Sequence, residues 1–245
     1  MRGNLQAETL RGREVVLAGG AGGMGSAVAE TLVAEGARLT VSYRANSQRA
    51  SRWQATATVV QADLSSAADR ARLLDAAPAL YGLVVLAGDP ARFADPSQLE
   101  AAAHRSHEAN YLGPILLARE ASARMRASST PGSIVMVSTM QANALFPGST
   151  VYAAQKAALQ HAALILAKEC RGSADIRVNV VSPGITAAGM AEASIAAGKY
   201  DRFLQEGVIP RYGRASDVAR AIRFFLEPDN YVTGQVLCVD GGISL

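Results

Sequence analysis

The chain of 245 residues has few of the features that mark secreted, metal-binding or membrane-spanning proteins. Its two cysteines, Cys170 and Cys238, stand in no C-x-x-C or Cys/His pattern, which excludes a disulfide framework or a zinc site built on such motifs. No apolar run approaches the roughly 18 residues of a membrane span. Residues 1–14 are polar where a secretory signal would need an apolar stretch. We therefore expect a cytoplasmic protein with no metal and no membrane contact.

Lysine is also scarce, with only Lys156, Lys168 and Lys199, so the formal net charge of +3 comes mostly from arginine. The basic residues are scattered rather than clustered with aromatic residues, and no nucleic-acid-binding motif is present. We expect no nucleic-acid partner. The charge supports at most a mild preference for anionic small molecules or for an acidic protein partner.

What the sequence does contain is an alternation of short apolar runs and longer segments rich in alanine and leucine. The runs are nearly continuous, as in strands buried on both faces. They predict strands at 14–18, 38–43, 58–61, 83–87, 133–138, 177–181 and 235–239, with helices at 25–35, 67–77, 113–127, 152–170 and 216–226. This order predicts one α/β domain over residues 1–245, a doubly wound parallel sheet of about seven strands with helices on both faces. Ligands of such sheets bind beyond the carboxyl ends of the strands.

A glycine-rich loop follows the first predicted strand and leads directly into a helical pattern. Gly19, Gly23 and Gly25 are spaced as in a Rossmann-type dinucleotide site. Glycine there permits a positive φ and a close approach of the backbone to a pyrophosphate, and the helix N-terminus attracts the phosphates. A merely flexible loop is the alternative, which the strand–loop–helix frame disfavours.

The end of the second predicted strand favours NADP(H) over NAD(H). It lacks the acidic residue that would bind an NAD ribose, and Arg44 follows directly, where a guanidinium can pair with a 2′-phosphate. A solvated surface arginine is the alternative. Asp63, after the third strand, could accept a hydrogen bond from the adenine amino group or cap the next helix.

Tyr152 and Lys156 are four residues apart at the start of a long predicted helix, which puts the phenol and the ammonium on one face. A neighbouring positive charge should lower the pKa of the phenol from its usual value of about 10. The pair then becomes a candidate acid–base centre. An interfacial tyrosine with a solvent-exposed lysine is the alternative reading.

With these motifs the chain resembles the short-chain dehydrogenase/reductase family along essentially its whole length. The matches in family order are Gly19-x-x-x-Gly23-x-Gly25, Ala87-Gly88, Asn110, Ser138-Thr139, Tyr152 with Lys156, residues 179–184 (NVVSPG), and Thr233-Gly234-Gln235 leading to Asp240-Gly241-Gly242. The resemblance implies that Tyr152 is the general acid for carbonyl reduction and that Lys156 also holds the nicotinamide ribose. It further implies that Asn110 supports a water relay and that Pro183 and Gly184 pack against the nicotinamide. The implied cofactor-binding set is Gly19, Gly23, Met24, Gly25, Arg44, Asp63, Leu64, Ala87, Gly88, Asn110, Tyr152, Lys156, Pro183, Gly184, Ile185 and Thr186.

Some positions depart from the family pattern. Ala18 replaces the usual threonine that opens the loop, Val85-Leu86 replaces an Asn-Asn pair, and Ala188 replaces a threonine after the Pro-Gly turn. Each change removes a hydrogen bond worth about 1 kcal/mol but leaves the acid–base pair in place. We expect altered cofactor contacts rather than loss of function.

Either Ser138 or Thr139 supplies the hydroxyl that binds the substrate oxygen. Adjacent residues at a strand end point to opposite faces, so only one should reach the substrate. The family spacing from Tyr152 selects Thr139, whereas a one-residue bulge between 140 and 150 would select Ser138. The three histidines, His104, His107 and His161, lie away from the strand ends and are not expected to be catalytic.

These observations predict an NADPH-dependent reductase of a ketone, with a small substrate lid at 185–208. The family resemblance suggests a 3-oxoacyl thioester carried on acyl carrier protein or CoA, with Arg124, Arg126 and Arg171 as docking residues for an acidic carrier. The alternatives are an NAD-dependent alcohol dehydrogenase of the same family and a nucleotide-binding sensor or scaffold with little turnover. Apolar surface on 113–127 and 152–170 predicts a homotetramer, with a dimer as the second choice.

Overall fold

The computed structural model describes residues 10–245 and contains one sheet of seven parallel strands. The strand order is β3-β2-β1-β4-β5-β6-β7, so the order reverses between β1 and β4. The strands are β1 Glu14–Ala18, β2 Arg38–Tyr43, β3 Ala57–Gln61, β4 Leu80–Val85, β5 Gly132–Val137, β6 Ile176–Pro183 and β7 Val236–Val239. The predicted doubly wound sheet is confirmed.

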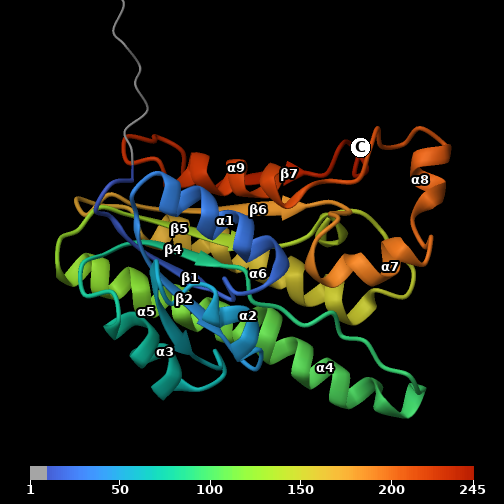
Figure 1. The fold of residues 1–245 in the computed structure, drawn as a ribbon, viewed down its shortest axis with the longest axis horizontal. Helices are drawn as coiled ribbons and strands as arrows, with labels where there is room; N and C mark the ends of the chain where they lie inside the picture. The colour runs from blue at the N-terminus through green and yellow to red at the C-terminus, as the bar shows by residue number, and fades with distance from the viewer. Residues whose placement is uncertain (1–9) are drawn as a thin grey trace, which may run out of the picture.

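Helices cover both faces of the sheet (Figure 1). The main helices are α1 Gly23–Ala34, α3 Ala67–Asp75, α4 Leu99–His107, α5 Gly113–Ala127, α6 Thr150–Glu169 and α9 Ala215–Leu226, with the shorter α2 Ser47–Ser51, α7 Glu192–Ala196 and α8 Asp201–Gln205. One core joins α1 and α9 to the sheet, and a second core joins α3, α5 and α6 to the opposite face. A third, smaller cluster includes Ile185, Ile195, Phe203 and Ile209, from the segment that carries α7 and α8. Among the described residues, no helix is long and apolar enough to cross a membrane.

The central strands β1, β4, β5 and β6 are buried along nearly their whole length, which explains why their sequences read as continuous apolar runs. Strands β4, β5 and β6 begin one to three residues earlier than predicted, and their carboxyl ends also differ from the prediction. Strand β4 ends at Val85 rather than Ala87, because the amides of Leu86 and Ala87 both donate to the Ala18 carbonyl and turn the chain out of the ladder. Strand β6 continues to Pro183, whose pairing with Val239 extends the sheet toward the site. The sequence pattern also missed α4, which has only Ala102 and Ser106 buried and therefore lacks an apolar stripe.

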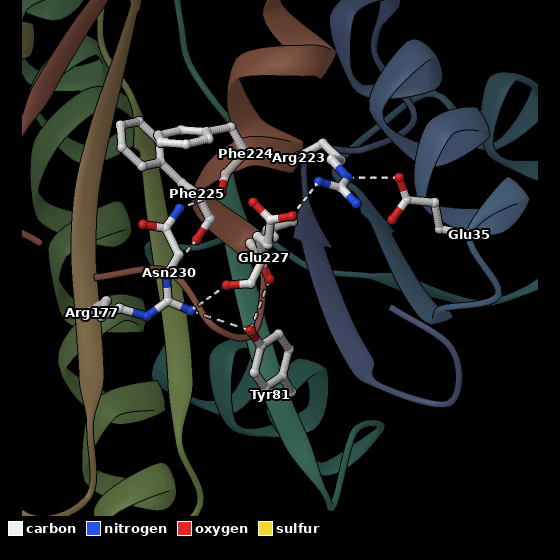
Figure 2. Close-up of polar contacts among 9 residues, drawn as sticks. Glu35, Tyr81, Arg177, Arg223, Phe224, Phe225, Glu227 and Asn230 are labelled. Carbon is white, nitrogen blue, oxygen red and sulfur yellow. Dashed lines mark hydrogen bonds and ion pairs between the residues drawn. The ribbon is translucent and has the colours of Figure 1, made fainter. Parts of the chain in front are cut away.

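Side chains from the amino ends of β4 and β6, among them a buried arginine, bind the last turn of α9 (Figure 2). Arg177, on β6, is 4% exposed, and its Nη1 donates to the Phe225 carbonyl at 3.0 Å and its Nη2 to the Glu227 carbonyl at 2.9 Å. The Tyr81 hydroxyl on β4 donates to the Leu226 carbonyl at 2.8 Å. A helix leaves its last carbonyls without intrahelical partners, and a cation there also interacts favourably with the helix dipole.

Replacing Arg177 should therefore destabilise the whole fold. Arg177→Met removes the donor to the Glu227 carbonyl and one of the two donors to the Phe225 carbonyl, which also accepts from the Ser133 hydroxyl on β5. We expect the free energy of unfolding to fall by about 2–4 kcal/mol in urea titrations followed by circular dichroism. Arg171→Met, at an exposed position, is the matched control. A loss below about 1 kcal/mol for Arg177→Met would show that water replaces the guanidinium at little cost.

Candidate active site

A cavity of about 480 Å³ lies beyond the carboxyl ends of β1, β2, β3 and β4, where the strand order reverses. The glycine loop forms its floor. Gly19 has φ +81°, and a Cβ there would lie 2.8 Å from the Ala87 amide nitrogen, so only glycine fits. A Cβ on Gly23 would lie 2.6 Å from the Gly189 nitrogen, and one on Gly25 2.5 Å from the Gly20 carbonyl oxygen. The predicted residues that line the cavity are Gly19, Gly23, Met24, Gly25, Arg44, Asp63, Leu64, Ala87 and Gly88.

Two arginines stand at the β2 side of this cavity, where the sequence predicted one. Arg44 follows β2, and Arg49 lies on α2. Asn46 is the N-cap of α2, and its side-chain oxygen accepts a hydrogen bond from the Arg49 amide at 2.9 Å. Neither arginine forms an ion pair among the described residues, whereas Arg52 nearby pairs with Glu30 at 2.6 Å. Sequence reasoning missed Arg49, because only the turn into α2 brings it to the cavity.

Asp63 also lines the cavity, but it does not cap the following helix. Its carboxylate accepts hydrogen bonds from the Ser65 amide at 3.0 Å and the Ser65 hydroxyl at 2.8 Å, which closes the turn after β3. Ser66 is the N-cap of α3 instead, accepting from the Asp69 amide. The helix-cap alternative for Asp63 is therefore wrong.

A second cavity, of about 520 Å³, lies beyond β5 and β6 and adjoins the first, with which it shares the lining residues Met24 and Met190. Its wall includes the predicted residues Ser138, Thr139, Tyr152, Pro183, Gly184, Ile185 and Thr186. The four residues from Pro183 to Thr186 thus lie on the second cavity rather than on the first. Glycine is required at Gly184, where a Cβ would lie 2.6 Å from the Asp240 Cα.

Tyr152 lies in the first turns of α6 with its phenol facing Thr139. Burial raises the pKa of Tyr152 to about 12, against a smaller lowering by the hydrogen bond with Thr139. The expected lowering by Lys156 is therefore wrong for this structure, in which desolvation of the phenolate dominates. A phenol with a high pKa stays protonated at neutral pH, which is the state that a proton donor requires.

Lys156 is one turn further along α6 and is 3% exposed. Its Nζ donates to the Val137 carbonyl at the end of β5, at 2.9 Å, and burial lowers its pKa to about 8. It also approaches the first cavity, because a Cβ on Gly88 would lie 3.5 Å from the Nζ. The Tyr152–Lys156 pair thus bridges the two cavities, with the phenol on one and the ammonium beside the other.

Ser138 and Thr139 have different environments. The Ser138 hydroxyl donates to the Lys156 carbonyl at 3.1 Å and so ties the end of β5 to α6. The Thr139 side chain faces Tyr152 and accepts from the Gln141 amide at 3.4 Å, which begins a short 3₁₀ turn. The two hydroxyls therefore have different partners, although both residues line the second cavity, and the assignment of Thr139 to the substrate oxygen stays a prediction.

Asn110 is fully buried in a π-helical turn, Glu108–Leu112, between α4 and α5. Its Nδ2 donates to the Asp89 carbonyl at 2.7 Å and to the Ser106 hydroxyl at 2.9 Å, and its Oδ1 accepts from the Asp89 amide at 3.1 Å. The two contacts with Asp89 hold the loop after β4. A Cβ on Gly88 would lie only 2.9 Å from the Asn110 Oδ1, so Asn110 packs closely against the segment that also borders Lys156.

The predicted carrier-docking arginines do not lie near these cavities. Arg124 and Arg126 are in the last turn of α5, which leads into the amino end of β5, and Arg171 follows α6 just before β6. Arg124 pairs with Asp75 at 2.7 Å, and Arg126 donates to the Glu169 carbonyl. Their expected place at the cleft rim is wrong, because helices of a parallel sheet return the chain to the opposite edge. Among the described residues, no cluster of His, Cys, Asp and Glu is arranged to hold a metal ion.

The glycine cradle lies where the strand order reverses, and the Tyr152–Lys156 pair on α6 lies next to it. This combination is that of a dinucleotide-dependent oxidoreductase. A family model described as enoyl-(acyl carrier protein) reductase matches residues 19–244. An uncharacterised oxidoreductase of Methylorubrum extorquens is 32% identical over 96% of this chain and 98% of its own length. The chain belongs to the short-chain dehydrogenase/reductase family and is an oxidoreductase of that family.

Other relatives have named activities or solved structures. The NADPH-dependent aldehyde reductase 2 of Arabidopsis thaliana chloroplasts is 28% identical over 96% of this chain and 95% of its own length. The structure of a short-chain type dehydrogenase/reductase from Mycobacterium ulcerans superimposes with a TM-score of 0.87 at 27% identity, covering 96% of this chain and 91% of that one.

The two hydroxyls should separate in a matched pair of variants. Thr139→Val removes the group that faces Tyr152, and we expect turnover to fall by about 30-fold or more. Ser138→Ala should instead lower the free energy of unfolding by about 1 kcal/mol and change turnover by less than about threefold. Steady-state kinetics and urea titrations of both variants test this. A larger loss of turnover in Ser138→Ala would move the substrate-binding role to Ser138.

Proposed function

We propose that this protein is an NADPH-dependent carbonyl reductase in which Tyr152 protonates the substrate oxygen as hydride reaches the carbonyl carbon. The observation that carries the proposal is the position of the pair between two adjoining cavities, with Tyr152 on the wall of one and Lys156 beside Gly88 of the other. One cavity has the glycine cradle of a dinucleotide, and the other has the phenol and a hydroxyl beside it. Only a site that brings a cofactor and a second molecule together needs both.

The chain's own residues divide the work of the reaction. The nicotinamide, when bound, supplies the hydride. The Thr139 hydroxyl orients the carbonyl oxygen, and the Tyr152 hydroxyl donates its proton to that oxygen as negative charge develops there. Lys156 is held by the Val137 carbonyl beside the cofactor cavity, where its ammonium would bind the nicotinamide ribose. Asn110 holds the Asp89 backbone and thereby the wall of the cofactor cavity.

Arg44 and Arg49 support a preference for NADP(H). Both line the cofactor cavity beside β2 without a carboxylate partner, and a 2′-phosphate would satisfy both guanidinium groups. The NADPH dependence named for the Arabidopsis relative agrees with this assignment. An NAD-dependent alcohol dehydrogenase would instead favour a carboxylate at the end of β2, where Tyr43 and Arg44 stand.

Cofactor titrations test this assignment. The unaltered protein should bind NADPH at least about tenfold more tightly than NADH. Arg44→Asp should reverse that order, and Arg49→Gln should reduce the ratio about threefold or more through the loss of one phosphate contact. Arg52→Gln, outside the cavity, is the control. Equal affinities for NADPH and NADH in the unaltered protein would contradict the phosphate role of both arginines.

The reduction itself is tested by Tyr152→Phe. Removing only the phenolic hydroxyl should lower the rate of carbonyl reduction by about 100-fold or more, while fluorescence titration still detects bound NADPH. Absorbance at the NADPH band, followed with a panel of ketones, aldehydes and acyl thioesters, gives the rate. Near-normal turnover by the variant would rule out this mechanism. Absence of turnover by the unaltered protein with every substrate would favour a binding-only sensor or scaffold.

The substrate is proposed to be a ketone or an aldehyde. The 3-oxoacyl thioester suggested by the sequence resemblance gains no support from Arg124, Arg126 and Arg171, which lie at the wrong edge of the sheet. A carrier protein or CoA would instead have to approach over the rim formed by the segment 185–208. The homotetramer and the cytoplasmic location stay predictions.

A further inference from the structure

We propose that the carbonyl substrate carries an anionic oxygen group, a carboxylate or a phosphate, that binds to Lys199 and Arg92 at the rim of the second cavity. This inference rests on the proposed reductase function and specifies its substrate class. Arg92 lies in the loop after β4, and Lys199 lies between α7 and α8. The sequence motifs assign no role to either residue.

The charge of the cavity wall is of one sign. Lys199 and Arg92 both line the second cavity, and among residues 10–245 no aspartate or glutamate lines it. The uncharged part of the wall contains Phe93, Phe146 and Tyr200. A cavity with aromatic walls and cations at the rim matches an organic molecule with an apolar body and an anionic end.

The carboxylates near Lys199 in the sequence are engaged elsewhere. Glu192 accepts a hydrogen bond from the Gly189 amide at 2.9 Å, and Asp201 accepts one from the Tyr212 hydroxyl at 2.8 Å. Within residues 10–245, Lys199 takes part in no ion pair. Its charge is therefore left for a ligand rather than neutralised by the protein.

Arg92 is held by the segment that covers the cavity. Its Nη2 donates to the Met190 carbonyl at 2.7 Å and contacts the Ser194 hydroxyl at 3.4 Å. A guanidinium has five N–H donors, so these two contacts leave others free for an anion. Arg92 thus joins the loop after β4 to the segment that carries Lys199, and an anion bound by both cations would hold the two walls together.

Lys199 is also connected to the chemical centre. Its Nζ lies 5.6 Å from the centroid of the Tyr200 ring, and Tyr200 lines the second cavity together with Tyr152. An anionic group bound to Lys199 therefore lies one aromatic side chain away from the carbonyl that Tyr152 would protonate. This separation fits a compact oxo acid or an aromatic ketone with a distal anionic group.

Binding of unreactive probes tests the charge without depending on turnover. The probes are 4-isopropylbenzoate, 4-isopropylphenyl phosphate and the neutral 4-isopropylbenzamide, titrated by calorimetry into the full chain with NADPH present. We expect at least one of the two anions to bind about tenfold more tightly than the amide. Lys199→Gln should bring that ratio close to one, and Lys199→Glu should favour the amide. Lys168→Gln removes the same charge from an exposed position on α6 and is the matched control.

Kinetics provide the second measurement. With NADPH, kcat/KM for 4-acetylbenzoate should exceed that for methyl 4-acetylbenzoate, and Lys199→Gln should lower this ratio about fivefold or more. A ratio that Lys199→Gln leaves unchanged, or tighter binding of the amide by the unaltered protein, would overturn the inference. Reduction of the ester alone would overturn it while leaving the reductase function intact. Anion binding that depends on Lys199, with no turnover of either ketone, would support the anion site and overturn the reductase function.

Discussion

The close contact between the glycine loop and the end of β4 is the constraint on which the rest of the site depends. The Ala18 carbonyl accepts hydrogen bonds from the Leu86 and Ala87 amides, and the Gly19 amide donates to the Ser42 hydroxyl on β2. Any side chain at Gly19 would collide with this backbone. The strand order reverses between β1 and β4, at this contact. The connections that leave the two strands run to opposite sides of the sheet, and the cofactor cavity lies between them.

The acid–base pair depends on a second set of contacts, between β5 and α6. The Ser138 hydroxyl and the Val137 carbonyl both bind Lys156, one to its backbone and one to its ammonium. Because the two anchors fix the first turns of α6, Tyr152 is presented to Thr139 at a defined position. The same burial that fixes the pair also sets its chemistry, since it keeps the phenol protonated and brings the ammonium pKa to about 8.

The opposite edge of the sheet does a different job. There, side chains of β4, β5 and β6 bind the last carbonyls of α9, with Arg177 at the centre (Figure 2). Hydrogen bonds to α9 thus occupy the amino ends of these strands, whereas the two cavities lie at the carboxyl ends. The last carbonyls of α9 find donors at the closed edge, whereas at the open edge Lys199 and Arg44 form no ion pair within residues 10–245.

The sequence by itself determined the parallel sheet, the glycine cradle and the Tyr152–Lys156 pair, because each is written in local spacing. The periodicity of apolar residues, the spacing of the glycines and the four-residue spacing of Tyr152 and Lys156 each involve only nearby residues, so the sequence alone reveals them. Only the tertiary structure decided the rest. It gave Ser138 and Thr139 different partners, raised rather than lowered the pKa of Tyr152, and removed Arg124 from the cleft. It also brought Arg49, Arg92 and Lys199 to the cavities. These properties depend on burial and on contacts between distant segments, and the sequence around each residue contains no signal for either.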